Sequence, residues 1–102
     1  MFGMDIMRQA QEMQSKIEAL QEELAKRTVT ASSGGGMVTV SANGRQELTA
    51  VSIERAVAEA ADAAMLEDLV LTAVNEALRR SRAMMAEEMR AVTGGFSIPG
   101  LS

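Results

Sequence analysis

The chain has 102 residues, the size of one domain, with no Cys, no His and a formal net charge of −4. The missing Cys excludes disulfides, thiolate metal sites and cysteine catalysis, and the missing His removes the commonest general base and metal ligand. We therefore predict that the protein is not an enzyme and has no metal site and no cofactor, and the acidic charge by itself disfavours a nucleic-acid partner.

Hydrophobic residues make up 47% of the chain, but aromatic residues only 2%. The core must therefore be built from Leu, Val, Ile, Ala and Met. A chain this small, with long apolar helix faces, often completes its core by oligomerising.

Residues 1–27 are predicted to form an amphipathic helix with Asp5 as a candidate N-cap. Apolar residues recur along it at alternating spacings of four and three, which is a heptad seam sustained over nearly three heptads. The seam consists of Ile6, Ala10, Met13, Ile17, Leu20 and Leu24. Two interpretations stay open: the helix packs on its own domain, or it pairs with a second chain.

After this helix the hydrophobic period changes to two, and residues 28–54 are predicted to form a three-stranded antiparallel meander. Asn43-Gly44 has the composition of a two-residue type I′ turn between the second and third strands. Leu48 and Val51 have opposite parity, so a bulge is expected near Thr49-Ala50. A sheet this small needs helices or a partner sheet to cover its apolar face.

The glycine run at residues 34–36 has two interpretations, a phosphate-binding loop or a turn between strands. A P-loop ends in Gly-Lys-Ser/Thr and leads into a helix, whereas this run leads into Met37-Val38-Thr39-Val40, which has a strand pattern and no Lys. The spaced glycines of a dinucleotide fingerprint are also missing. We therefore predict a turn within the sheet, without a bound nucleotide.

Residues 55–63 are predicted to be an Ala-rich connector with room for one helical turn, and residues 64–93 a second long helix with Asp62 as its N-cap. The apolar residues of this helix form a stripe with two further members at its margin. The stripe consists of Leu66, Val70, Ala73, Ala77, Met84 and Met85, with Val74 and Val92 at the margin.

The tail at residues 94–102 begins with two glycines, which are expected to end the second helix. Its apolar residues Phe96, Ile98 and Leu101 leave two interpretations open, a docked cap or a frayed end. No apolar run reaches the length of about 20 residues that spans a membrane, and the N-terminus lacks the pattern of a signal peptide. The whole chain, 1–102, is predicted to be a single cytoplasmic α+β domain with no membrane partner.

Basic residues gather in the last half of the second helix. At about 100° per residue, Arg79 and Arg90 project from nearly the same side, with Arg82 about 60–80° away, and all three lie off the apolar stripe. A second basic group on the first helix consists of Arg8 and Lys26, which share an outer face, and Lys16 nearby. Such groups are either solvated charged faces or a ridge that binds phosphates, and their pattern alone leaves both interpretations open.

Four segments, in this order, resemble the YbaB/EbfC family of bacterial nucleoid-associated proteins: MRQAQEMQSKIEALQEELAK, GGGMVTVSANGRQELTAVSI, MLEDLVLTAVNEAL and TGGFSIPGL. The resemblance covers nearly the whole chain, although Glu54-Arg55 stands where the family often has Asp-Pro and Phe96 replaces a usual aliphatic residue. It implies an α-β-β-β-α protomer, in which a three-stranded antiparallel meander lies between two long helices. It also implies a homodimer whose sheets join at the centre and whose helices project like tweezers.

The same resemblance implies binding of double-stranded DNA in the nucleoid, with a role in nucleoid organisation or gene regulation. Because the family has no fixed DNA-contacting motif, we select the candidate residues from the two basic groups: Arg79, Arg82 and Arg90 first, then Arg8, Lys16 and Lys26. No helix carries an obvious set of base-reading side chains, so contacts are expected mainly with phosphates and with low sequence specificity.

An alternative hypothesis is a small coiled-coil adaptor that binds a protein partner, such as a recombination or replication factor. The acidic charge, the nine methionines and the heptad seam support it. Capture of one stoichiometric partner that persists after nuclease treatment would favour the adaptor, whereas salt-sensitive retardation of duplex DNA would favour the DNA-binding protein.

Overall fold

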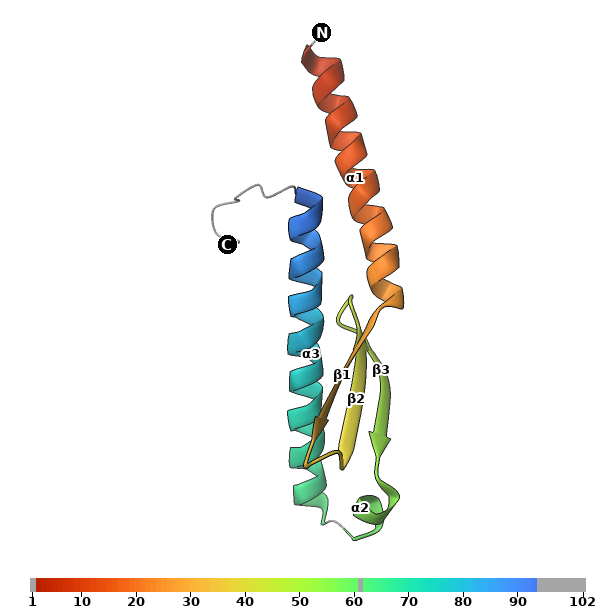
Figure 1. The fold of residues 1–102 in the computed structure, drawn as a ribbon, viewed down its shortest axis with the longest axis vertical. Coiled ribbons are helices and arrows are strands. Elements are labelled where there is room, and N and C mark those ends of the chain that lie inside the picture. The colour runs from red at the N-terminus through yellow and green to blue at the C-terminus, as the bar shows by residue number, and fades with distance from the viewer. Residues whose placement is uncertain (1, 61, 94–102) are drawn as a thin grey trace.

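The structure, a computed structural model, describes residues 2–60 and 62–93. Its elements follow one another in the order α1 (Phe2–Lys26), β1 (Thr28–Ser33), β2 (Val38–Asn43), β3 (Leu48–Ile53), α2 (Arg55–Ala60) and α3 (Ala63–Thr93). The predicted α+β class and α-β-β-β-α order are confirmed, and the connector holds the short helix α2 (Figure 1). The predicted glycine end of the second helix and the tail at 94–102 lie outside the described residues.

The three strands form one antiparallel sheet in the order β1-β2-β3. The glycine run joins β1 to β2 as a turn, and its three residues have positive φ, which glycine adopts without steric cost. Between β2 and β3 the register shifts: Ser41 lies opposite Ala50, but Ala42 lies opposite Leu48, so Thr49 is the extra residue of a bulge. The predicted bulge is confirmed, and it brings Leu48 onto the same face of the sheet as Val51.

One face of the sheet is covered by α3, which packs along β1 and β2 (Figure 1). Val38, Val40 and Ala42 of β2 are fully buried against Ala73 and Ala77 at the centre of the predicted stripe. Because side chains alternate along a strand, the opposite face carries the intervening polar residues, among them Thr30, Ser41 and Ser52. The core therefore lies between α3 and two of the three strands.

The predicted type I′ turn at Asn43-Gly44 is wrong, since neither residue has positive φ. The left-handed residue is Gln46, with φ 65°, and its N–H donates to the carbonyl of Asn43 at 3.2 Å. The strands are joined by a three-residue loop, a type I turn followed by one left-handed residue. Gly44 is needed for close approach instead, because a Cβ at this position would lie 2.7 Å from Cδ2 of Leu24 and 2.8 Å from its carbonyl oxygen.

The helix α1 begins at Phe2, so Asp5 lies in its first turn and is not its N-cap, as the sequence had suggested. The apolar seam is divided by the length of α3: Leu24 is fully buried and Leu20 is 7% exposed, whereas Ile6 is 64% and Met13 37% exposed. The N-terminal half of α1 extends past the end of α3 in an elongated molecule of 70 × 25 × 17 Å (Figure 1). Packing on its own domain thus accounts for only the C-terminal half of the seam.

Asp62 caps α3 as predicted, because its Oδ1 accepts a hydrogen bond from the N–H of Met65 at 2.7 Å. We expect Asp62→Ala to lower the free energy of unfolding by about 1 kcal/mol, as measured by urea denaturation, because a helix N–H loses its partner. Asp62→Asn is the matched control and should stay within a few tenths of a kcal/mol, since Asn caps equally well. Equal losses in both variants would show that the charge matters and the cap does not.

Candidate nucleic-acid interface

The six basic residues predicted to contact DNA are all exposed on α3 and α1: Arg79, Arg82, Arg90, Arg8, Lys16 and Lys26. They differ in whether an acidic neighbour compensates their charge. This difference follows from positions along each helix, because residues three and four apart share one helix face.

On α3 the basic ridge is largely neutralised by acidic side chains of the same helix. Glu76 binds Arg79 and, at 3.0 Å, Nε of Arg80. Glu87 lies 3.6 Å from the guanidinium of Arg90. Arg79 and Arg90 stay 70% and 74% exposed, so these pairs are solvated and weak, but the field around each guanidinium is reduced. In the described part of the chain, Arg82 makes no ion pair.

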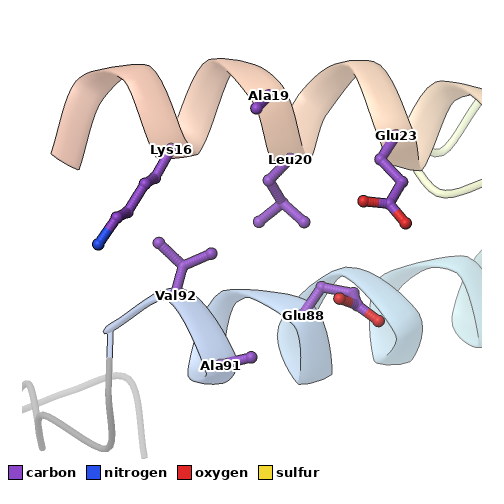
Figure 2. A pocket seen from close by; sticks show the side chains of 7 residues that line it. All are labelled: Lys16, Ala19, Leu20, Glu23, Glu88, Ala91 and Val92. Carbon is purple, nitrogen blue, oxygen red and sulfur yellow. The ribbon is translucent and has the colours of Figure 1, made fainter. Parts of the chain in front are cut away.

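The basic residues of α1 have no acidic partner among the described residues, although Glu12, Glu18 and Glu22 lie on the same helix. Lys16 extends from α1 at the open end of the crevice between α1 and α3, beside Val92 (Figure 2). Arg8 and Lys26 lie 18 residues apart, which is about 27 Å along a helix. These cations therefore form a line along α1 and no compact cluster.

The β2–β3 hairpin is held between the two long helices by backbone hydrogen bonds. The N–H of Gly44 donates to the carbonyl of Leu24 at 2.8 Å and to that of Arg27 at 3.1 Å, so the hairpin caps the C-terminus of α1. On the other side, the hydroxyl of Ser81 on α3 donates to the carbonyl of Asn43 at 2.6 Å and accepts from the N–H of Gln46 at 3.1 Å.

This attachment places Arg45, an exposed residue that the sequence patterns did not indicate, between the end of α1 and the middle of α3. Its neighbours are the cations adjacent to the bonded residues: Lys26 follows the last turn of the α1 seam, and Arg82 follows Ser81. We call Lys26, Arg45 and Arg82 the junction group. None of the three makes an ion pair within residues 2–60 and 62–93, so their charges are available to an anion.

An ion pair between Arg27 and Glu88 joins α1 to α3 beside the junction group. It fixes the two helices at this level, and the crevice above it is lined by Leu20 and Glu23 from α1 and by Val92 from α3 (Figure 2). The junction group thus stands on a rigid corner where two helices and a hairpin meet.

Within the described residues, no three acidic side chains converge as metal ligands, and no helix is long and apolar enough to cross a membrane. The chemistry that the exposed surface offers is electrostatic: guanidinium and ammonium groups without acidic partners suit phosphate oxygens. A duplex presents such oxygens at regular intervals along its backbone.

Comparison with known proteins agrees with this chemistry. Residues 1–96 match the YbaB/EbfC DNA-binding family. The chain is 53% identical over 97 residues to the nucleoid-associated protein TTE0040 of Caldanaerobacter subterraneus subsp. tengcongensis, a match that covers 95% of this chain and 87% of that protein. It is 50% identical over 99 residues to a nucleoid-associated protein of Syntrophobacter fumaroxidans, covering 97% and 90%. The crystal structure of the uncharacterized protein HP0035 from Helicobacter pylori superposes with a TM-score of 0.70 at 27% identity, covering 87% of this chain and 88% of that one.

Proposed function

The chain belongs to the YbaB/EbfC DNA-binding family, and we propose that it is a nucleoid-associated protein that binds double-stranded DNA as a homodimer. It acts in the cytoplasm on the nucleoid, in its organisation or in gene regulation. Contacts are mainly to phosphates and have low sequence specificity. The observation that carries the proposal is the junction group, three exposed cations from three elements with no acidic partner among the described residues.

The homodimer is supported by an apolar face that α3 leaves uncovered. Because α3 packs on β1 and β2, the apolar residues of β3 stay open on the same side of the sheet: Leu48 is 45% and Val51 50% exposed. The adjoining flank of α3 contributes a groove lined by Leu66, Val70, Leu71 and Val74. We call these residues of β3 and α3 the open apolar face.

A second copy of the chain is the occupant that this face fits. Open apolar surface next to a free sheet edge is typical of protein interfaces, and a two-fold dimer pairs one such surface with itself. Joining at β3 also leaves the arms formed by α1 and α3 projecting from the centre (Figure 1). Each arm then carries one junction group at its base.

The acidic net charge limits the strength of binding. A dimer carries −8, twice the −4 of the chain, so long-range attraction to DNA is poor and contacts depend on local cation groups. Non-specific affinities on the order of 10⁻⁴–10⁻⁶ M follow, with steep weakening as salt rises. Arg8, Lys16, Arg79 and Arg90 extend the contact along the arms in this proposal.

We expect Arg45→Glu combined with Arg82→Glu to weaken binding of a duplex at least tenfold and to lower the slope of log K against log salt by about 2, one for each lost phosphate contact. The measurement is a gel-shift or anisotropy titration at about 50 and 200 mM salt. Arg55→Glu is the matched control, because Arg55 is an exposed cation on α2 at the opposite end of the sheet (Figure 1). Its binding should stay near that of the unmodified chain.

Two results would contradict the proposal. No retardation of duplex DNA by the unmodified chain at low salt would remove the function itself. An equal loss in Arg55→Glu would show that overall charge governs binding and that the junction group has no particular part in it.

Glu76→Gln is expected to have the opposite effect. It removes the carboxylate that binds both Arg79 and Arg80, so the ridge on α3 gains positive charge and duplex affinity should rise a few-fold at low salt, with a steeper salt dependence. Glu59→Gln is the control, since it makes the same change of charge at an exposed site on α2. If both variants gain equally, the ridge on α3 does not contact DNA.

The exposed N-terminal half of α1 supports the second candidate, an adaptor for a protein of recombination or replication. Met4, Ile6 and Met7 are each more than 60% exposed, and flexible methionines suit adaptable interfaces. Affinity capture after nuclease treatment separates the candidates: one stoichiometric protein that persists favours the adaptor, and its loss with the nucleic acid favours DNA binding.

A further inference from the structure

The crevice between α1 and α3 continues as an open apolar strip beyond the end of α3. Leu20 points across the crevice towards α3, close to Val92 (Figure 2). Residues of one heptad seam share a face of the helix, so the earlier seam residues point to the same side. We call Ile6, Ala10, Met13 and Ile17 the α1 strip. No described residue covers its N-terminal part, where Ile6 is 64% exposed.

The nine residues that follow α3 suit this strip in composition. Residues 94–102 carry no charge and three large apolar side chains, Phe96, Ile98 and Leu101. Phe96 and Ile98 are two apart, so an extended backbone directs both to one side. Pro99 prevents the segment from continuing the helix. An apolar segment next to an open apolar surface gains free energy by burying both.

Chain geometry allows the contact without rearrangement. The last residues of α3 lie level with Lys16 (Figure 2), and the strip runs ten residues onwards from there to Ile6, about 15 Å along the helix. Nine extended residues span about 30 Å. The distance that must be covered is therefore half of the reach available.

We propose that residues 94–102 turn back at Gly94-Gly95 and dock in extended form on the α1 strip of the same chain. The segment takes the place that α3 vacates and completes the pairing of α1 along its length. It holds the projecting half of α1 in line with α3, and it covers the strip that a second copy or another protein would otherwise bind.

Because the chain has no Cys, an introduced pair of cysteines reports this contact alone. The test uses the full chain with Met13→Cys and Ile98→Cys under mild oxidation, read by non-reducing electrophoresis and mass spectrometry. Docking within the chain predicts a disulfide at monomer mass, at a yield that does not change with protein concentration. Ser15→Cys with Ile98→Cys is the matched control, because Ser15 lies about 200° around the helix from Met13 and should not be bridged.

A disulfide at dimer mass, formed equally by Met13→Cys alone, would overturn the proposal, since the strip would then face a second copy. Equal yields for the Met13 and Ser15 pairs, or no bridge at all, would overturn it as well. A second measurement needs no cysteine: Phe96→Asp with Ile98→Asp should accelerate amide hydrogen exchange in residues 6–17 at least tenfold and leave residues 38–53 unchanged. Ser97→Asp, which adds a charge between the two apolar positions, should accelerate exchange much less.

Discussion

Val51→Asp is expected to convert the proposed homodimer into a monomer and to weaken binding of long duplex DNA by about 10²–10⁴-fold. Val51 is half exposed at the centre of the open apolar face, opposite Val40 on β2. In a two-fold dimer the substitution buries two carboxylates close together, and an unpaired buried charge costs several kcal/mol. The loss of affinity follows because one protomer no longer holds the second on the same duplex.

The monomer should stay folded, since Val51 is not part of the buried core. Light scattering gives the mass of the particle, circular dichroism reports its folding, and titrations with duplexes of about 12 and 60 base pairs separate single from bivalent contact. Ser52→Asp is the matched control, because the adjacent residue on β3 points to the polar face. If Ser52→Asp dissociates the dimer and Val51→Asp does not, the copies meet through the other face of the sheet.

Gly44→Ala is expected to destabilise the fold by about 2–4 kcal/mol, although the change adds a single carbon. The new Cβ would lie within 2.9 Å of three atoms of Leu24, one of them the carbonyl oxygen of the backbone. The hairpin must therefore move away from α1, and the hydrogen bonds from Gly44 to Leu24 and Arg27 weaken with it. Urea denaturation measures the loss, and faster exchange in the last turn of α1 locates it.

Gly3→Ala is the control for this result, since no atom lies within 4 Å of the added carbon. An alanine within a helix is favoured over glycine by about 1 kcal/mol, so the two glycine substitutions should change stability in opposite directions. A Gly44→Ala variant as stable as the unmodified chain would show that the hairpin does not press against α1.

Several features of the fold are local and were predictable from the order of residues. The change of hydrophobic period after the first helix separates helix from strand, because each element buries one face at its own repeat. Asp62 caps α3 through the N–H of Met65, three residues on. The parity conflict between Leu48 and Val51 indicated the bulge at Thr49. Each of these depends on contacts a few positions away or on one adjacent strand.

The neutralised ridge on α3 belongs to the same local class, although the sequence analysis selected Arg79 and Arg90 without regard to their acidic neighbours. Glu76 and Glu87 stand three residues before them, the spacing at which helix side chains meet. Checking each candidate cation for an acid at this spacing would have indicated Arg82 as the least compensated residue of the ridge.

Other features depend on contacts between segments that are distant in the chain. The Asn43-Gly44 pair suggested a type I′ turn, but the close approach of Leu24 determines which glycine conformation fits there. Arg45 stands beside Arg82 only because Ser81, 38 positions from Asn43, bonds the hairpin to α3. The arrangement of the strands under α3 leaves Val51 open while Val40, in the same pattern of alternation, is fully buried. Periodicity assigns a side chain to a face of its element, whereas which faces meet depends on how whole elements fill space around a common core.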